Sequence, residues 1–249
     1  MNDELLQLLE QLRFKGMSAV MGDLLTKAQR EGWGHQDLLL RLLQEELNYR
    51  RERSVQYRLT QAKIPWSWTL NTFPFEQQPT INKTRIMTLA GLDFMERGEN
   101  IIFTGSTGTG KSGLASGLLR QALISGYRGR FYNVQDLLDE LYASLADLST
   151  PKLLNKLCRY DLLVLDELGY LTLSHEQMNS FFKLMKERYE AKRPTIITTN
   201  LTFDNWYDIL QPKDMVDALL DRLRHRCCMI HIDGESLRTP TADKSFHPL

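Results

Sequence analysis

The sequence has few cysteines, no excess of either charge and no long apolar run. Its cysteines number three and two of them, Cys227 and Cys228, are adjacent, so they cannot build a disulfide framework or a zinc site. Lys and Arg together number 31, as do Asp and Glu, so the net charge draws the chain to neither nucleic acid nor membrane. Any such binding must come from a local patch.

Segments that would direct the chain out of the cytoplasm are not found either. No window approaches the roughly 18 apolar residues that a membrane span needs. The first residues, MNDELLQLLEQLRFK, mix acidic residues with leucines and lack the basic-then-apolar order of a signal peptide. We therefore expect a reduced, soluble protein of the cytoplasm.

The chain length predicts more than one domain. At roughly 150 residues per domain, 249 residues correspond to one large domain and one small one. Helical periodicity covers residues 1–63, and a third helix is expected to begin near Asp37. Leu5, Leu8 and Leu12, with their neighbours Leu6 and Leu9, form an apolar helix stripe. We expect this stripe to pack inside the domain or else between subunits.

Residues 64–80 interrupt the helical pattern. Prolines break the periodicity, and four aromatic residues predict that the stretch packs against a neighbouring surface. The predicted organisation is a helical domain over 1–63, a linker over 64–80, a second domain over 81–238 and a flexible tail over 239–249.

Short apolar runs alternate with helical stretches from Asn100 onwards. Strands spaced by helices predict an α/β fold with a five-stranded parallel sheet covered by helices on both faces. Ser174 and Gln177 form a capping-box pair at the start of one helix. The expected strands are 101–104, 130–133, 162–165, 195–199 and 228–232, and the expected helices are 111–125, 135–145, 174–191 and 214–224.

A phosphate-binding loop follows the first of these strands. Residues 105–112 match the pattern G-x-x-x-x-G-K-[ST], in which glycines let backbone N–H groups turn inward around phosphates. Lys111 is expected to reach the β- and γ-phosphates, and the Ser112 hydroxyl to bind Mg²⁺. The alternative is a glycine-rich strand–helix turn without a nucleotide. The expected nucleotide-binding residues are Gly105, Ser106, Thr107, Gly108, Thr109, Gly110, Lys111 and Ser112.

Two carboxylates end the buried run at 162–165. Ligands of parallel sheets bind at the carboxyl ends of strands, so Asp166 and Glu167 are expected beside the phosphate loop. Asp166 would hold Mg²⁺, directly or through water, and Glu167 would polarise the attacking water. The second carboxylate indicates hydrolysis rather than transfer to a bound substrate. An ordinary Asp-Glu turn after a strand is the alternative.

An amide and several arginines complete the candidate site. Asn200 ends the strand 195–199 and is a candidate to hydrogen-bond the attacking water or the γ-phosphate, although Asn is also an ordinary turn former. Arg222, Arg224 and Arg226 close a helix, where arginines favour the helix dipole. Alternatively, one of them reaches the γ-phosphate of a neighbouring subunit, and the sequence leaves open which. Arg238 is a second candidate for contacting nucleotide, or a solvated arginine.

The order of these motifs resembles that of the AAA+ ATPases, and more specifically that of the IstB-like helper ATPases encoded by bacterial insertion sequences. The resemblance runs from about residue 5 to residue 238. The segments that carry it, besides the phosphate loop, are 73–79, 81–83, 89–94, 99–100, 166–170, 220–223 and 234–236 followed by Arg238.

The resemblance implies an ATP-dependent DNA-binding regulator that assembles on target DNA and works with a partner transposase. In it Lys111 and Ser112 would bind ATP and Mg²⁺, with Asn200 as a sensor and Arg222 as an arginine finger for the next subunit. Two departures are Gly-Ser-Thr in the phosphate loop, where many relatives have Gly-Pro-Pro, and Ser112, where threonine is commoner. Neither changes the chemistry. The short chain after Ile232 agrees with the lack of a helical lid in this family.

A basic stretch of the third helix is the candidate for DNA contact. Positive side chains there would neutralise phosphates and give salt-dependent, largely sequence-blind binding. A solvated helix face interrupted by Glu52 is the alternative. Nothing resembles a recognition helix, so we expect non-specific or shape-driven binding in which repeated subunits multiply weak contacts. The candidate residues are Arg50, Arg51, Arg53, Arg58 and Lys63.

The sequence therefore leads to the hypothesis of a Mg²⁺-dependent ATPase that forms homo-oligomers on double-stranded DNA, with ATP at subunit interfaces, and assists a transposase. A bacterial helicase loader is the nearest rival, and capture of a replicative helicase would favour it. A small-molecule kinase would be stimulated by a metabolite instead of DNA. In a DNA-binding module with a vestigial nucleotide site, Glu167→Gln would change nothing measurable.

Overall fold

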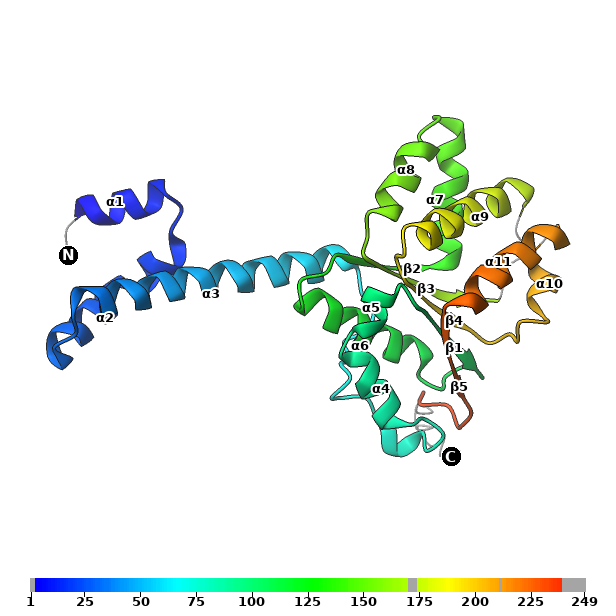
Figure 1. The fold of residues 1–249 in the computed structure, drawn as a ribbon, viewed down its shortest axis with the longest axis horizontal. Coiled ribbons are helices and arrows are strands. Elements are labelled where there is room, and N and C mark those ends of the chain that lie inside the picture. Colours follow the sequence, from blue (N-terminus) through cyan, green and yellow to red (C-terminus); the bar gives the residue numbers. More distant parts are fainter. Residues whose placement is uncertain (1–2, 170–173, 211, 239–249) are drawn as a thin grey trace, which may run out of the picture. The chain divides into compact units, whose positions relative to one another are not determined.

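The chain forms two compact units, Met1–Arg58 and Leu59–Leu249. They are seen in a computed structural model that describes residues 3–169, 174–210 and 212–238 (Figure 1). The boundary between the units falls inside one helix, α3 (His35–Ala62). None of the helices in these described ranges combines the length and the apolar character that a membrane crossing requires.

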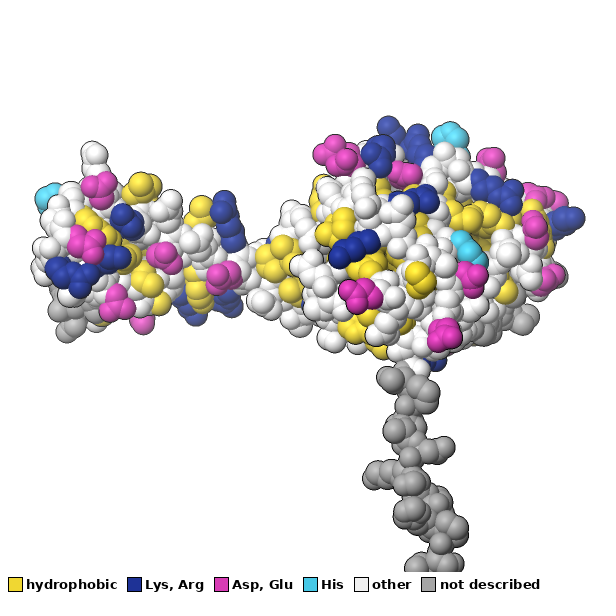
Figure 2. Space-filling model, turned by 90° about the horizontal axis from the view of Figure 1, so that it is seen from below, with side chains coloured by type: hydrophobic (Ala, Val, Ile, Leu, Met, Phe, Trp, Pro, Cys, Tyr) yellow, Lys and Arg dark blue, Asp and Glu magenta, His cyan; other side chains and the backbone are white. Residues whose placement is uncertain are grey.

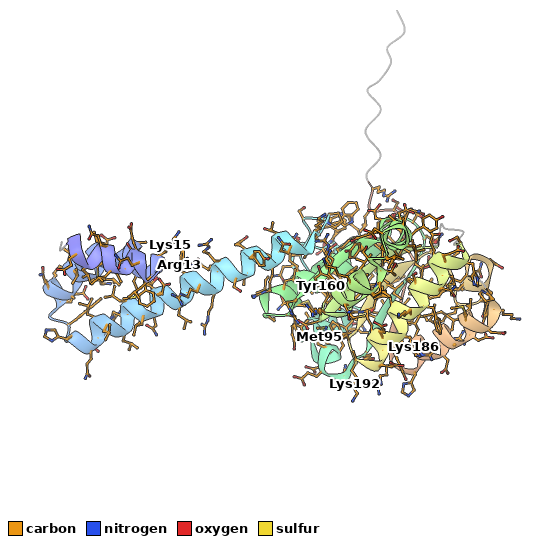
Figure 3. All side chains as sticks on the ribbon, turned by 90° about the horizontal axis from the view of Figure 1, so that it is seen from above. Arg13, Lys15, Met95, Tyr160, Lys186 and Lys192 are labelled. Carbon is orange, nitrogen blue, oxygen red and sulfur yellow. The ribbon has the colours of Figure 1, made fainter. Side chains whose placement is uncertain are left out.

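The first unit is helical, as the periodicity predicts. It contains α1 (Asp3–Gln11), α2 (Lys15–Glu31) and most of α3, which begins slightly before the expected Asp37. Arg13, with φ of 57°, and Lys15 lie at the turn between α1 and α2 (Figure 3).

The core of the first unit is small, and it uses only part of the expected leucine stripe. Its buried side chains are Leu9, Met17, Met21 and Leu42. Leu5, Leu8 and Leu12 are instead 38%, 48% and 59% exposed, so packing inside the domain is confirmed for Leu9 and wrong for these three. Periodicity identifies an apolar face, whereas the position of α2 decides which face of α1 is covered.

Glu46 of α3 accepts hydrogen bonds from the start of α2, beside this small core. Its buried carboxylate accepts hydrogen bonds from the amides of Gly16 (2.7 Å) and Met17 (3.2 Å) and from Arg50 Nε (2.7 Å). These amides belong to the first turn of α2, where backbone N–H groups have no helical partner. Burial raises the pKa of Glu46, but the hydrogen bonds from Arg50, Met17 and Gly16 outweigh it and leave the pKa below its ordinary value.

The second unit contains a parallel sheet of five strands within its described residues, as predicted. The strands lie in the order β2-β3-β4-β1-β5, so β3, β4 and β1 are neighbours. In register, Ile101 of β1 faces Ile196 of β4, and Leu163 of β3 faces Thr195 of β4. The strands are β1 (Asn100–Gly105), β2 (Gly129–Asn133), β3 (Leu162–Leu168), β4 (Thr195–Thr199) and β5 (Cys227–Ile232).

Helices cover both faces of the sheet (Figure 1). Ile101 and Phe103 of β1 point to a core with α6, whereas Ile102 between them joins the core on the opposite face. Both sides of β1 are therefore apolar, as in strands buried on both faces of a sheet. On the first face lie α4 (Lys83–Ala90), α5 (Asp93–Arg97) and α6 (Lys111–Ile124); on the second lie α7 (Val134–Ala146), α8 (Thr150–Cys158), α9 (His175–Glu190), α10 (Trp206–Ile209) and α11 (Lys213–His225).

Residues 64–80, expected as a linker, lie in this second unit. Leu70 and Phe73 are buried in the core around α6, and a short 3₁₀ helix, η1 (Phe75–Gln77), follows. Trp68 and Phe75 also pack against this core, so the expected packing is observed for three of the four aromatic residues, whereas Trp66 is 41% exposed. The expected tail over 239–249 and Tyr170 of the motif 166–170 lie outside the described residues.

Candidate active site

The phosphate loop connects β1 to α6. Gly110 precedes the first residue of α6 with φ of +96°, a conformation that L side chains rarely adopt. The buried Thr109 hydroxyl donates to Ser106 O (2.9 Å) and so closes the loop on itself. The unpaired backbone N–H groups at the start of α6 then make this loop an anion-binding site.

Lys111 is folded into the loop. Its Nζ donates to the backbone carbonyls of Gly105 (2.8 Å) and Ser106 (2.6 Å). Burial lowers the pKa of Lys111, and the nearby carboxylates of Asp166 and Glu167 partly offset this decrease. The ammonium group therefore lies where a phosphate anion would also stabilise its charge.

Thr198 joins the acidic pair to the neighbouring strand. Its hydroxyl donates to Asp166 Oδ1 (2.5 Å) and accepts from the backbone N–H of Glu167 (2.9 Å). Burial raises the pKa of Asp166, while hydrogen bonds from Thr198 and Ser112 oppose that rise. Thr198 lies inside the strand 195–199 and was not singled out in the sequence, because its contact depends on the pairing of β3 with β4.

Glu167 has an unusual backbone and a side-chain partner. Its φ is +62°, and the register of β3 on β4 shifts between Leu165 and Leu168, as at a β-bulge. Such a conformation costs a non-glycine residue about 1–2 kcal/mol and is typical of functional sites. Glu167 Oε2 accepts a hydrogen bond from Asn133 Nδ2 (2.8 Å) at the end of β2.

Asn133 is a site residue that the sequence analysis missed. Its Oδ1 accepts from Gln135 N (2.9 Å) and caps α7, while its amide nitrogen holds Glu167. A pattern that could have identified it was present, because Asn133 ends the expected strand 130–133 much as Asn200 comes directly after the strand 195–199. Its contact with Glu167 depends on the order of the strands.

A cavity of about 370 Å³ brings the predicted residues together. The phosphate loop and α6 contribute Thr107, Gly108, Gly110, Lys111, Ser112 and Gly113, and the other lining residues are Trp66, Trp68, Glu167, Thr198, Thr199, Asn200, Leu237 and Arg238. Leu237 N donates to Gly108 O (2.9 Å), so the chain after β5 lies on the loop and carries Arg238 to the cavity. Arg238 is thus a lining residue rather than a remote one.

The oxygen atoms next to Lys111 fit a magnesium ion. The Ser112 hydroxyl and the Asp166 carboxylate are within hydrogen-bonding reach of each other, and both are the hard oxygen ligands that Mg²⁺ prefers. In the described ranges no group of three or more His, Cys, Asp or Glu side chains gathers to hold a metal. A magnesium ion here would therefore depend on nucleotide phosphates for further ligands.

Arg222 lies away from the phosphate loop of its own chain. Its Nη1 donates to Ala218 O (2.6 Å), and its guanidinium lies 5.4 Å from the centre of the Phe182 ring. It lines a small cavity together with Asn100, which is the first residue of β1. The phosphate loop, in contrast, follows the last residue of β1. At about 3.3 Å per strand residue, these ends lie about 16 Å apart. Arg224 and Arg226, farther along the chain, lie over the rings of Phe203 and Tyr189.

The candidate DNA-contact residues do not form one set. Arg50 is paired with Glu46, and its guanidinium lies 5.3 Å from the Phe14 ring centre. Lys63 belongs to the second unit and lines a separate cavity beside Glu167. Arg51 and Arg53 are exposed, Arg58 is half-buried, and these three with Arg50 lie in the first unit. On the face seen in Figure 2, positive, negative and hydrophobic side chains are interspersed over this unit.

The sequence matches the family described as IstB-like ATP binding protein over residues 7–245. It is 36% identical over 235 residues to a Pseudomonas aeruginosa protein whose name describes ATP binding in insertion sequence IS21, covering 94% of this chain and 88% of that one. It is 33% identical over 230 residues to a Bacillus thuringiensis subsp. berliner protein named similarly for insertion sequence IS232, covering 92% of both. The resemblance stated from the residues is confirmed.

Solved structures of replication proteins share the fold. The DnaC helicase loader is similar with a TM-score of 0.57 at 25% identity, over 69% of this chain and 99% of that chain. The replication initiator DnaA, solved with AMPPCP and single-stranded DNA, gives a TM-score of 0.58 at 19% identity, over 70% of this chain and 52% of that chain. These similarities confirm the expected AAA+ fold.

Proposed function

This chain belongs to the IstB-like ATP binding proteins, and from that premise we propose that it assembles on double-stranded DNA and assists a partner transposase. It is an ATPase of the AAA+ class. The observation that carries the proposal is the meeting of Lys111, Asp166 and Glu167 at one edge of the sheet, in a chain whose relatives are named for insertion sequences.

We propose the following roles at the site. The loop amides and Lys111 bind the phosphates of ATP, and Asp166 and Ser112 hold Mg²⁺, which when bound screens the β- and γ-phosphate charges. Glu167 accepts a proton from the attacking water once its carboxylate leaves Asn133, and Asn200 orients that water. Thr198 fixes the carboxylate of Asp166 and the backbone of Glu167 from the next strand.

Arg222 is proposed to act on the ATP of a neighbouring subunit. Support comes from its position beside the amino end of β1, because its own phosphate loop lies beyond the carboxyl end. An arginine that completes the site from outside makes ATP favour assembly. Loss of the γ-phosphate then removes that contact and weakens the interface.

DNA binding is proposed to rest on the basic side chains of α3 in the first unit, chiefly the exposed Arg51 and Arg53, with Arg58 on the same helix. Arg50 is given no part because it pairs with Glu46. Each phosphate contact should add to the salt dependence of binding. Replacement of the three by Gln should therefore reduce both the affinity and the salt slope for duplexes of any sequence, while Arg30→Gln, on α2, should change neither.

Sedimentation of the full chain with a duplex tests the assembly. With a non-hydrolysable ATP analogue the wild type should form large complexes on DNA, and Lys111→Ala should not. Glu167→Gln should retain ATP and remain assembled when ATP itself is supplied. A wild type that stays monomeric with nucleotide and duplex would refute the proposal.

A helicase loader is the second candidate, because the similarity to DnaC covers nearly all of that chain. The partner distinguishes the two. Retention of a replicative helicase, with no retention of a transposase, would favour the loader.

A further inference from the structure

The nucleotide cavity has an aromatic wall that the phosphate chemistry does not use. Besides the phosphate loop and the polar ends of β3 and β4, it is lined by Trp66, Trp68, Leu237 and Arg238. Trp66 is 41% exposed, so part of its ring is free to be covered by a ligand. The indole rings of Trp66 and Trp68 lie 6.4 Å apart between centroids. Trp66 also lines the neighbouring cavity that contains Asp166 and Glu167.

The segment that carries these two rings packs closely against α6. A Cβ on Gly113 would lie 2.3 Å from the Trp68 ring, and one on Gly117, a turn later, would lie 2.6 Å from Leu70. The two glycines thus leave space for the segment along one face of the helix. Arg120 Nη2, also on α6, donates to Trp66 O (3.0 Å).

Trp68 is further held by Phe73. The two rings meet edge to face with centroids 5.7 Å apart, and Phe73 is buried against the loop at Gly110. Edge-to-face pairs of this kind add stability beyond the area they bury. The aromatic wall is therefore fixed to the same helix start that is expected to bind the phosphates.

The direction of the bound triphosphate follows from the loop. Backbone amides at the start of the helix cradle the α- and β-phosphates, while Lys111 reaches the β- and γ-phosphates. Glu167 and Asn200 lie where hydrolysis of the γ-phosphate needs them. The nucleoside must leave the loop from the α-phosphate, and Trp68 packs on Gly113, the residue that follows Ser112.

We propose that Trp66 and Trp68 form the binding surface for the purine base of the nucleotide. This inference rests on the proposed ATP site and assigns the part of it that recognises the base. A purine stacked on the wall would cover the exposed face of Trp66 and gain contact with two rings that are already held in place. Stacking on indole grows with ring size, so the surface favours purines over pyrimidines.

Calorimetric titration of the full chain with three probes tests this assignment. The probes are the magnesium complexes of ATP, CTP and inorganic tripolyphosphate, the last of which carries no base. Trp66→Leu should weaken ATP binding about five- to fiftyfold and reduce the preference for ATP over CTP. Its tripolyphosphate affinity should stay within twofold of the wild type. Trp33→Leu, a tryptophan of the first unit, is the matched control and should change nothing.

Trp68→Phe provides a second variant. Phe is chosen because Trp68 is packed more deeply than Trp66, so that a Leu at this position would destabilise the fold. It should keep an aromatic surface and lose less ATP affinity than Trp66→Leu.

The outcomes separate this inference from the proposed function. If the tryptophan variants bind ATP like the wild type, while Lys111→Ala loses both ATP and tripolyphosphate, the nucleotide site stands and the base-binding wall is wrong. Equal losses of ATP and tripolyphosphate in Trp66→Leu would also overturn it, since the ring would then support only the loop. A wild type that binds neither probe would refute the ATP site itself.

Discussion

Thr198→Val is a sharp test of how the acidic pair is held. The substitution keeps the shape of the side chain and removes a hydroxyl that donates to Asp166 Oδ1 at 2.5 Å and accepts from Glu167 N at 2.9 Å. A hydrogen bond to a charged group contributes about 1.5–3 kcal/mol, and the unpaired buried amide costs about 1 kcal/mol more. We therefore expect a loss of about 3 kcal/mol in the free energy of unfolding.

Thr199→Val is the matched control for this loss. Thr199 is equally buried in the same strand, but its hydroxyl accepts from an uncharged backbone amide, Leu201 N (3.0 Å), so about 1 kcal/mol is expected. Urea unfolding of the full chain measures the two losses, and single-turnover ATP hydrolysis measures the catalytic effect. Thr198→Val should hydrolyse at least about tenfold more slowly, because Asp166 and Glu167 lose their common support. Equal stability of the two variants with undiminished hydrolysis would refute the reasoning.

Three further predictions concern other contacts. Glu46→Gln should destabilise the first unit by about 2 kcal/mol near neutral pH. The pKa of Glu46 is lower in the folded state than its ordinary value of 4.5. Glu46 therefore stabilises the folded state above pH 4.5, and this stabilisation is lost as the pH falls through the folded-state pKa. The helical circular dichroism signal should show this loss of stability in acid for the wild type but not for the variant. Asn133→Ser keeps a cap for α7 but releases Glu167, so stability should change by less than about 1 kcal/mol while ATP turnover without DNA changes by more than twofold; unchanged turnover would deny Asn133 a role. Arg222→Ala should bind ATP normally and lose hydrolysis, and mixing it with Lys111→Ala should restore turnover; failure of every mixture would argue against action between subunits.

Most of the sheet and the phosphate loop could be predicted from the sequence because both depend on neighbours along the chain. The alternation of buried strands with helices fixes the fold class, and the loop pattern specifies its own conformation. The helix α8 was missed although Pro151 near its start is a typical helix-initiating residue.

The missed site residues have a different cause. Thr198 and Asn133 contact Asp166 and Glu167 across strands, and the order β2-β3-β4 follows from packing rather than from any local pattern. Arg50 is a different case, because its partner Glu46 lies four residues earlier on the same helix, α3. That i,i+4 spacing of a carboxylate and an arginine is visible in the sequence.

The separation of Arg222 from its own phosphate loop has a geometrical consequence. If the arginine of one copy serves the loop of the next, the two surfaces in contact are different, and the association is heterologous. Such a contact repeats from copy to copy until it closes on itself or continues as a filament. Turnover per mole should then fall steeply on dilution, as copies at the free ends lose the residue that completes them.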